Sequence, residues 1–576
     1  MPQRLLLSLV TIGLGLSCFV SCSPAAPAEA PAAADETVQR YVPLLKDPDA
    51  LVRKRAAVAL KRMGAKAKSA VPALEEALAD KDAEVRAAVA AALEAIDPEP
   101  RTTAEKPAPP LPKERGKPAA ENPVDSTSPI EPAKSPRRPP SSERAEVGSY
   151  SFGPKSPPSI LVSRKAGDEP WHRLKPGARV SAGDKLVSLP GYVSEVRLDS
   201  GVHLLLRGHV PEFSLFPDMN YLQESALVLH KSKDTDADLT LQCGRLYVSN
   251  HKNKGAAAVV HLRFEKEIWT LTLRPGTEVV VDLLKRYRGD VDYLKGEPPV
   301  ATLHLLVLQG KAGLSAGEQH YPDLSAPPGP AYFQWSNKGA GLRGPLKQES
   351  VPIFFRLVLP IDPNKNPDAE KMEQALKQLS LRMPADKDPS VVLEEVLQKG
   401  NDPVPHRLAI YCLGALDEIN ALLDVLGDTD VVHARERETA IFTLRRWLGR
   451  DARNGSKLFD PKTKTGILKD KKMYTTSEAE TIFALLHDFS EEEIFAVETY
   501  DKLARELVST KVAIAELARW HLYRLAKIQG VSIPSIDKFN AATPRDVREV
   551  AYSEVKNKID KGELPVQAAL VKPKGK

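Results

Sequence analysis

The stretch from Ser159 to about Lys338 constrains the fold of this chain most, because short apolar runs alternate there with turn residues. Glycine supplies the positive φ that tight turns require, proline presets φ, and aspartate bonds its own backbone. Strand-sized runs at near-regular spacing, each followed by such a turn, favour an all-β sandwich, barrel or roll over βαβ units. The turn signals include Pro176-Gly177, Gly183-Asp184, Pro190-Gly191 and Asp199-Ser200-Gly201.

We expect this all-β domain to occupy residues 148–345. The apolar runs that we assign as strands are 159–163, 171–174, 179–182, 185–189, 192–198, 202–206, 227–230, 239–241, 245–249, 259–264, 269–273, 278–281 and 302–308. A further strand-like run lies at 351–360, within a connector that we place at 346–366.

The β stretch resembles the FecR family in four places. The family's pattern of strand, Pro-Gly turn and strand is found at Leu174 to Val187 and in the strand that ends in Leu198-Asp199-Ser200-Gly201. Cys243 to Val248 resembles its G-x-L-x-V strand, Leu273 to Val280 its T-P-G-T-x-x-x-V segment, and Val307 to Leu314 its closing V-x-x-G-x-V. The resemblance implies a bacterial, extracytoplasmic β domain. In the best-known members this domain is the sensing half of a transmembrane anti-sigma regulator of iron uptake.

The first 22 residues read as a signal peptide with a lipobox. A basic start is followed by the apolar run 5–20, which is too short and too N-terminal for a stable spanning helix. A small residue precedes both Cys18 and Cys22, and Cys22 is the expected lipidation site, which would tether the mature chain to a membrane by acyl chains. Cleavage near Ala28-Glu29-Ala30 is the alternative, and it would release a secreted protein. Both readings predict an exported protein, either a periplasmic or outer-membrane-tethered lipoprotein or a secreted one.

Residues 35–97 contain two copies of one helical unit. Eight positions of the first copy match the second at a constant offset of 33 (85 − 52), a period typical of paired-helix solenoids. Each unit has an acidic turn placed to cap its second helix. The units resemble bacterial HEAT repeats, and that resemblance implies a structural ladder of Asp–Arg pairs between repeats. The ladder residues are Asp47, Arg53, Asp80 and Arg86.

Residues 98–147 form a proline-rich linker. Thirteen of the 49 prolines of the chain fall there, among charged residues and with almost no apolar side chains. Such a composition buries too little surface to offset chain entropy, so we expect an extended, disordered spacer.

Residues 367–562 change to a helical period, and 563–576 form a basic tail. Apolar residues recur there at intervals of three and four, which fits an α-solenoid or an irregular bundle of HEAT-like helices. Asp428-Thr429-Asp430 repeats the acidic turn of the N-terminal units, and Arg435 or Arg437 could replace the ladder arginine. The candidate helices are 369–379, 389–399, 405–416, 419–426, 432–448, 477–486, 491–507, 512–527 and 544–558.

Charge and motifs exclude several classes of site. The 81 basic and 76 acidic residues nearly cancel, which gives no reason to expect nucleic-acid binding. No nucleotide-binding, hydrolase or metalloprotease motif is present, so we predict no catalytic, cofactor-binding or metal-binding residues. His433 and His521 lack a second ligand at i+4, and His487 has only the adjacent Asp488, so we expect structural or solvated histidines.

These features predict a non-enzymatic envelope protein, with a FecR-like domain that recognises an envelope component and helical repeats that contact other proteins. A small-molecule ligand is left open. One alternative is an extracytoplasmic sensor in a FecR-type signalling or transport route. The other is a hydrolase whose site is assembled from residues distant in sequence.

Overall fold

The computed structural model describes residues 38, 41–46, 53–54, 56–57, 60–61, 64–96, 145–151, 158–165, 169–213, 223–339, 341–352, 355, 367–385, 387–400 and 402–566. It divides into a smaller unit, residues 1–46 and 54–99, and a larger unit, residues 47–53 and 100–576. The predicted signal peptide with Cys22, nearly all of the predicted linker, and Asp47 lie outside the described residues.

The smaller unit is helical, as the 33-residue period predicts. Its described elements are η1 (Pro43–Lys46), η2 (Gly64–Ala70), α3 (Val71–Ala77) and α4 (Ala83–Ile96). The repeat positions Val38, Leu60 and Val85 are fully buried. The Val85 amide donates to the Asp82 carboxylate over 3.2 Å, so Asp82 satisfies an otherwise free amide in the first turn of α4.

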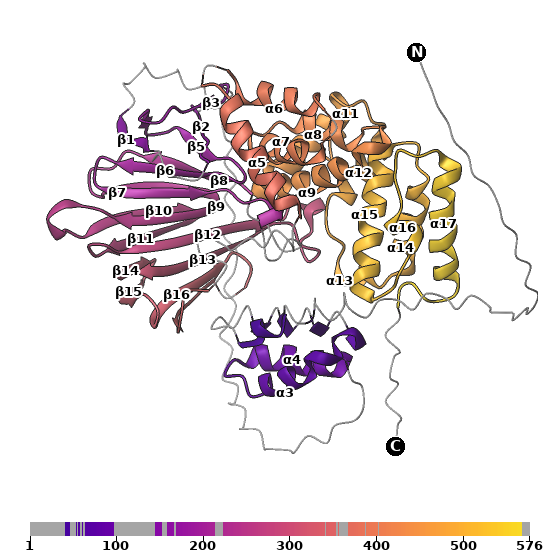
Figure 1. The fold of residues 1–576 in the computed structure, drawn as a ribbon, viewed down its shortest axis with the longest axis horizontal. Coiled ribbons are helices and arrows are strands. Elements are labelled where there is room, and N and C mark those ends of the chain that lie inside the picture. The colour runs from indigo at the N-terminus through magenta and orange to yellow at the C-terminus, as the bar shows by residue number, and fades with distance from the viewer. Residues whose placement is uncertain are drawn as a thin grey trace, which may run out of the picture. The chain divides into compact units, whose positions relative to one another are not determined.

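The described residues of the larger unit form 17 strands followed by a helical region (Figure 1). Its strands are β1 (Glu146–Ser151), β2 (Leu161–Arg164), β3 (His172–Arg173), β4 (Arg179–Ser181), β5 (Lys185–Ser188), β6 (Val193–Leu198), β7 (Val202–Arg207), β8 (Ser225–His230), β9 (Ala237–Asn250), β10 (Ala258–Phe264), β11 (Glu267–Leu273), β12 (Glu278–Arg286), β13 (Val300–Gln309), β14 (Lys311–Ala316), β15 (Gln319–Ser325), β16 (Gly329–Ser336) and β17 (Gly341–Gln348). The short helices η3 (Pro211–Phe213), η5 (Asn253–Gly255) and η6 (Tyr293–Lys295) lie between strands.

The strands form one curled sheet whose two parts share β9. Sheet A has the order β4-β1-β6-β7-β9-β12-β13-β16-β17 and is antiparallel throughout. Sheet B has the order β3-β2-β5-β8-β9-β10-β11-β14-β15, and only its β9–β10 pair is parallel. Apolar residues from both parts form a single cluster, so the core lies between sheets A and B.

Gly244 is where β9 passes from sheet B to sheet A. Before it, the odd-numbered Leu239 and Leu241 contribute to the core between the sheets, and after it the even-numbered Leu246 and Val248 do so. Gly244 has φ +92°, and a Cβ there would lie 2.3 Å from the Glu224 carbonyl oxygen. The sequence predicts two strands here because glycine usually ends a strand. The structure corrects this to one strand with a glycine bend.

The helical region contains α5 (Pro367–Arg382), α6 (Pro389–Leu397), α7 (Pro403–Ala415), α8 (Ile419–Leu426), η8 (Val431–His433), α9 (Ala434–Arg450), α10 (Arg453–Leu458), α11 (Ile467–Asp470), α12 (Thr476–Leu485), α13 (Glu491–Ile494), α14 (Val497–Leu507), α15 (Val512–Gln529), α16 (Pro534–Asp537) and α17 (Arg545–Asp560). The predicted helix 491–507 is two helices, because Phe495 and Ala496 leave the helical conformation between α13 and α14.

The helical region packs directly on the outer face of sheet B (Figure 1). Val162, Val187, Ala226 and Cys243 belong to the helical core cluster, although they come from β2, β5, β8 and β9. Their chain neighbours face the opposite core between the sheets, so these strands are buried on both faces. Burial on both faces explains why the strands read as continuous apolar runs rather than as clean alternation.

Candidate functional site

The contact between sheet B and the helices contains a buried charge cluster centred on Glu224. Arg446 of α9 contacts the Glu224 carboxylate at 3.3 Å and Arg450 contacts it at 3.2 Å. Burial alone would raise the pKa of Glu224, but Arg446 and Arg450 outweigh burial and lower that pKa to about 2. The Cys243 thiol donates to the same carboxylate over 3.3 Å, and burial raises its pKa to about 11. Cys243 is therefore a packed thiol rather than a nucleophile.

A second acidic residue, Asp417, extends this cluster to the edge of the interface. Its carboxylate contacts Arg164 at 3.2 Å and Lys185 at 3.6 Å, both on sheet B, and also pairs with Arg450. The Arg164 guanidinium stacks on Trp171, with 4.4 Å to the ring centroid, and the Trp171 indole donates to the Leu416 carbonyl over 2.8 Å. Each buried charge has a partner from the opposite layer, so the cluster joins sheet and helices.

The predicted ladder residues are described only in part. Asp47 and Cys22 lie outside the described residues. Arg53 is 5% exposed, whereas Arg86 is exposed and donates from Nη1 to the Asp80 backbone carbonyl over 2.7 Å. The Asp80 carboxylate accepts the Asp82 amide over 2.8 Å. Within the second repeat, arginine and aspartate therefore organise the turn before α4.

Three arginines of the C-terminal helices contact backbone carbonyls in the same manner. Arg437 donates to the carbonyls of the acidic turn, at 3.1 Å to Asp428 and 2.7 Å to Asp430. Arg445 donates to carbonyls that follow α12, and Arg548 donates to carbonyls at and just after the end of α14. Helix ends leave carbonyls without intrahelical partners, and these guanidinium groups satisfy them. This arrangement repeats the role of Arg86 in the smaller unit.

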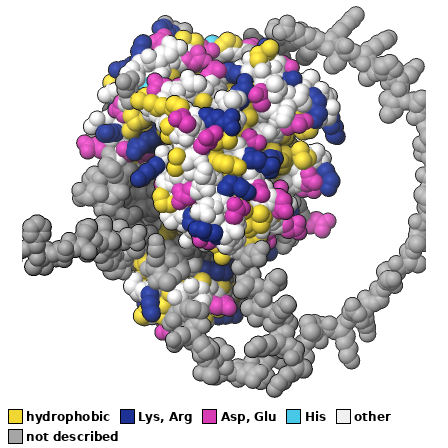
Figure 2. Space-filling model, turned by 90° about the vertical axis from the view of Figure 1, so that its right-hand side faces the viewer, with side chains coloured by type: hydrophobic (Ala, Val, Ile, Leu, Met, Phe, Trp, Pro, Cys, Tyr) yellow, Lys and Arg dark blue, Asp and Glu magenta, His cyan; other side chains and the backbone are white. Residues whose placement is uncertain are grey.

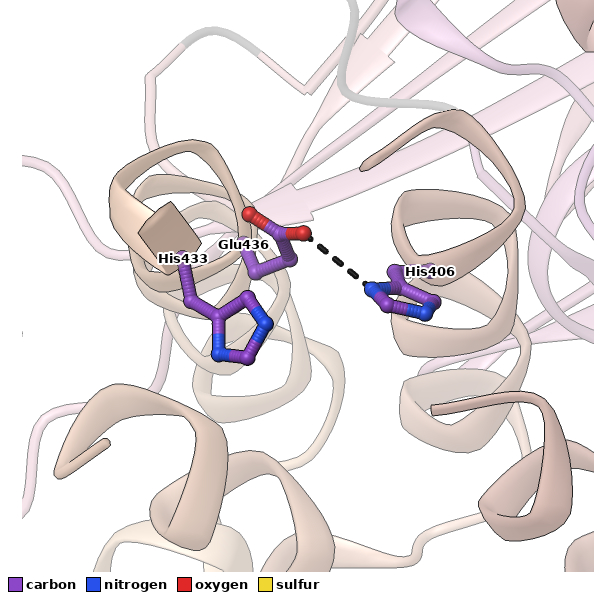
Figure 3. A group of neighbouring side chains, drawn as sticks. All are labelled: His406, His433 and Glu436. Carbon is purple, nitrogen blue, oxygen red and sulfur yellow. Dashed lines mark hydrogen bonds and ion pairs between the residues drawn. The ribbon is translucent and has the colours of Figure 1, made fainter. Parts of the chain in front are cut away.

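A group of three potential metal ligands lies where η8 and the first turn of α9 face α7 (Figure 3). His433 ends η8, Glu436 lies one turn later in α9, and His406 projects from α7. The 433/436 spacing places both side chains on one side of the helix start. One ligand atom from each of the three residues lies within 4.8 Å of the other two.

Outer hydrogen bonds orient both imidazole rings of this group. His433 Nδ1 lies 2.9 Å from Asp428 Oδ2. The other carboxylate oxygen of Asp428, Oδ1, accepts a hydrogen bond from the Asp430 amide over 2.7 Å. His406 Nε2 lies 3.2 Å from the Lys399 carbonyl oxygen. Because a carbonyl only accepts, Nε2 of His406 carries the proton in this contact.

The inner atoms of the group lie in a nearly dry environment. His406 Nδ1 is 3.2 Å from Glu436 Oε1, and the two side chains are 3% and 5% exposed. The hydrogen bond to Glu436 raises the pKa of His406. The second carboxylate oxygen, Glu436 Oε2, is buried without a hydrogen-bond partner.

In the sequence His433 has no second ligand at the i+4 position, which predicts a structural or solvated histidine. The structure provides neighbours from i+3 and from another helix. The one local signal was the His433-x-x-Glu436 spacing, and nothing in the sequence links it to His406, which comes from the preceding helical pair.

The other two singled-out histidines are buried structural residues. His521 lies 2.7 Å from the Leu485 carbonyl, and burial lowers its pKa to about 3. His487 stacks on Tyr293 with centroids 3.7 Å apart, and burial lowers its pKa to about 4. The stacked rings of Tyr293 and His487 are a further contact between the strand-rich part and the helices.

Comparison with known proteins matches one segment of the chain. Residues 33–105 match the family model for HEAT repeats. The search of curated proteins and the search of solved structures each returned no match. Within the described part of the chain, each helix is too short or too polar to cross a membrane.

Proposed function

We propose that this protein is a non-catalytic scaffold of the bacterial cell envelope. In this proposal the β domain recognises an envelope component, and the helical repeats contact other proteins. The HEAT-repeat match at residues 33–105 supports the second role, because stacked helical repeats present extended surfaces for protein contacts. The predicted lipobox and the resemblance to FecR support the location.

The observation that carries the proposal is the buried ion cluster of Glu224, Arg446 and Arg450 at the interface between the strands and α9. A buried ion cluster across an interface is lost if the two layers separate, because each charge would be left without its partner. The β layer and the helical layer therefore act as one rigid body. A rigid body of this size suits a protein that holds partners at fixed positions.

The surface of the helical region also suits protein contacts. Basic and acidic side chains are interspersed with apolar ones on the face that Figure 2 shows. Exposed apolar side chains in the C-terminal helical region include Phe495, Val547 and Val550, of which Val550 is 64% exposed. Val547 and Val550 lie three residues apart on α17, so they share one side of the helix.

Cross-linking mass spectrometry on intact cells tests the proposal. We expect cross-links from lysines of the β domain to an envelope component and from the helical regions to proteins. The double variant Val547→Glu/Val550→Glu should lose cross-links from α17 but keep those of the β domain. Leu294→Glu, at a 57% exposed position in the β part, is the matched control. The proposal is wrong if none of the three regions yields a partner.

A further inference from the structure

The structure assigns a metal site to His406, His433 and Glu436: we propose that they bind one divalent first-row transition ion, with Zn²⁺ the best chemical match. Two imidazole nitrogens and one carboxylate oxygen are a ligand set that Zn²⁺ accepts, with a fourth position left for water. The proposal is independent of the scaffold function.

The protonation pattern of His406 leads to this inference. Because Nε2–H is directed to the Lys399 carbonyl, the lone pair of a neutral ring lies on Nδ1, 3.2 Å from Glu436 Oε1. The His406 Nδ1 lone pair and the Glu436 carboxylate oxygen repel each other at this distance unless a proton or a metal ion lies between them. A proton would satisfy this pair alone, but it leaves Glu436 Oε2 without a partner. A metal ion would use the carboxylate and His433 together.

The spacing of the ligand atoms suits an ion. Zinc lies about 2.0–2.2 Å from nitrogen and oxygen ligands, so two ligand atoms of a tetrahedral site lie about 3.3 Å apart. The His406–Glu436 pair already has this separation, at 3.2 Å. The largest separation in the group, up to 4.8 Å, closes when the His433 ring moves inward. His433 has room to move, because its side chain is 24% exposed.

The second layer of contacts is that of a metal site. Histidine ligands usually donate their outer N–H to a carboxylate or a backbone carbonyl, which fixes the ring and its tautomer. His433 has Asp428 in that position and His406 has the Lys399 carbonyl. Glu436 lies in the first turn of the 17-residue helix α9, whose dipole favours the ionised carboxylate that a metal requires.

The test uses the full chain, purified without a polyhistidine tag and stripped with a chelator. Zn²⁺ is titrated in competition with a chromophoric chelator, and Co²⁺ is added separately to record its ligand-field absorption. We expect one tight equivalent of Zn²⁺, a tetrahedral Co²⁺ spectrum, and a higher Tm with Zn²⁺, because an ion that binds only the folded state stabilises it.

Three variants test how much individual residues contribute to Zn²⁺ binding. His433→Ala removes a partly exposed ligand without disturbing the His406–Glu436 contact, so it should fold and lose the tight equivalent. Asp428→Asn removes only the outer contact and should weaken Zn²⁺ binding by about 10–100-fold. His320→Ala, at an exposed histidine of β15, is the control and should bind Zn²⁺ like the parent. The proposal is overturned if the parent binds no tight equivalent, or if His433→Ala binds Zn²⁺ as tightly as His320→Ala does.

Discussion

Glu224 and Arg446 are separated by 222 residues in the chain, yet their charged groups lie 3.3 Å apart and both side chains are almost completely buried. Glu224 precedes β8 of sheet B, and Arg446 lies near the end of α9. Together with Arg450 they form a buried ion cluster at the interface between the strand layer and the helices. The stability of the larger unit should therefore respond strongly to changes in this cluster.

Glu224→Gln should destabilise the protein by about 3–5 kcal/mol, because it removes the buried carboxylate that Arg446 and Arg450 share and leaves Arg450 only its pair with Asp417. Denaturant unfolding followed by tryptophan fluorescence and by far-UV circular dichroism measures this loss. Glu318→Gln, an exposed glutamate in the turn between β14 and β15, is the control and should change stability by less than about 0.5 kcal/mol. Equal effects of the two substitutions would contradict a structural role for the cluster.

The contribution of Glu224 should disappear in acid. Its pKa is lowered from 4.5 to about 2 in the folded state, so the folded state favours the ionised form. The resulting stability is fully present above pH 4.5 and is lost as the pH falls towards 2. The shift corresponds to about 3 kcal/mol. Unfolding free energies of the parent and of Glu224→Gln should converge over this range, and a constant difference would show that the ionised carboxylate is not the source.

Gly244→Ala should disrupt the passage of β9 between the sheets. Gly244 has φ +92°, and an added Cβ would meet the backbone of residues 224 and 225. Gly276 also has a positive φ, +68°, but has open space around it. Gly276→Ala should therefore cost about 1–2 kcal/mol from backbone strain alone, and Gly244→Ala distinctly more. Thermal unfolding of the two variants separates strain from steric overlap, and equal Tm losses would refute the overlap.

Arg53→Ala should destabilise the protein more than Arg86→Ala does. Arg53 is 5% exposed, so its removal leaves a cavity and breaks buried contacts. Arg86 is exposed and its contact to the Asp80 carbonyl faces solvent, which limits its contribution to about 1 kcal/mol. Thermal unfolding of the full chain measures both effects. A larger effect of Arg86→Ala would reverse this order and favour the inter-repeat ladder for Arg86.

Cys22→Ala should abolish lipid attachment. In cells fed a labelled fatty acid, the parent and Cys18→Ala should carry the label, whereas Cys22→Ala should not. Loss of the anchor should also shift the chain from the membrane fraction to the soluble fraction, since acyl chains alone would tether it. Label on Cys22→Ala, or none on the parent, would exclude the predicted site.

Local signals made the positions of most strands within residues 159–308 predictable. Turn glycines such as Gly201 need a positive φ, +87° here, wherever the chain folds, and the apolar runs between them are buried. The strand β15 was missed because it lies at the edge of sheet B and is mostly exposed, so it lacks an apolar run. The sequence predicts a strand break at Gly244 because a glycine bend within one strand and a glycine turn between two strands have the same residue signature.

The charge cluster and the histidine group could not be predicted, because tertiary contacts create them. Nothing in the sequence relates Glu224 to α9, or His406 to the turn before Glu436. In contrast, the acidic turn at Asp428 is visible in the sequence, which leaves Arg435 and Arg437 open as its partner. In the structure Arg437 donates to the carbonyls of that turn.

The sharing of β9 by both sheets limits how this protein can vary. Residues on either side of Gly244 point inward with opposite parity, so deleting or inserting one residue in β9 would expose the core-facing side chains of one sheet while leaving the other intact. Related chains should therefore keep the length of this strand constant and place their insertions in the outer hairpins. The strand is also a poor place to split the protein into fragments, because each piece would carry about half of both sheets with unpaired strand edges.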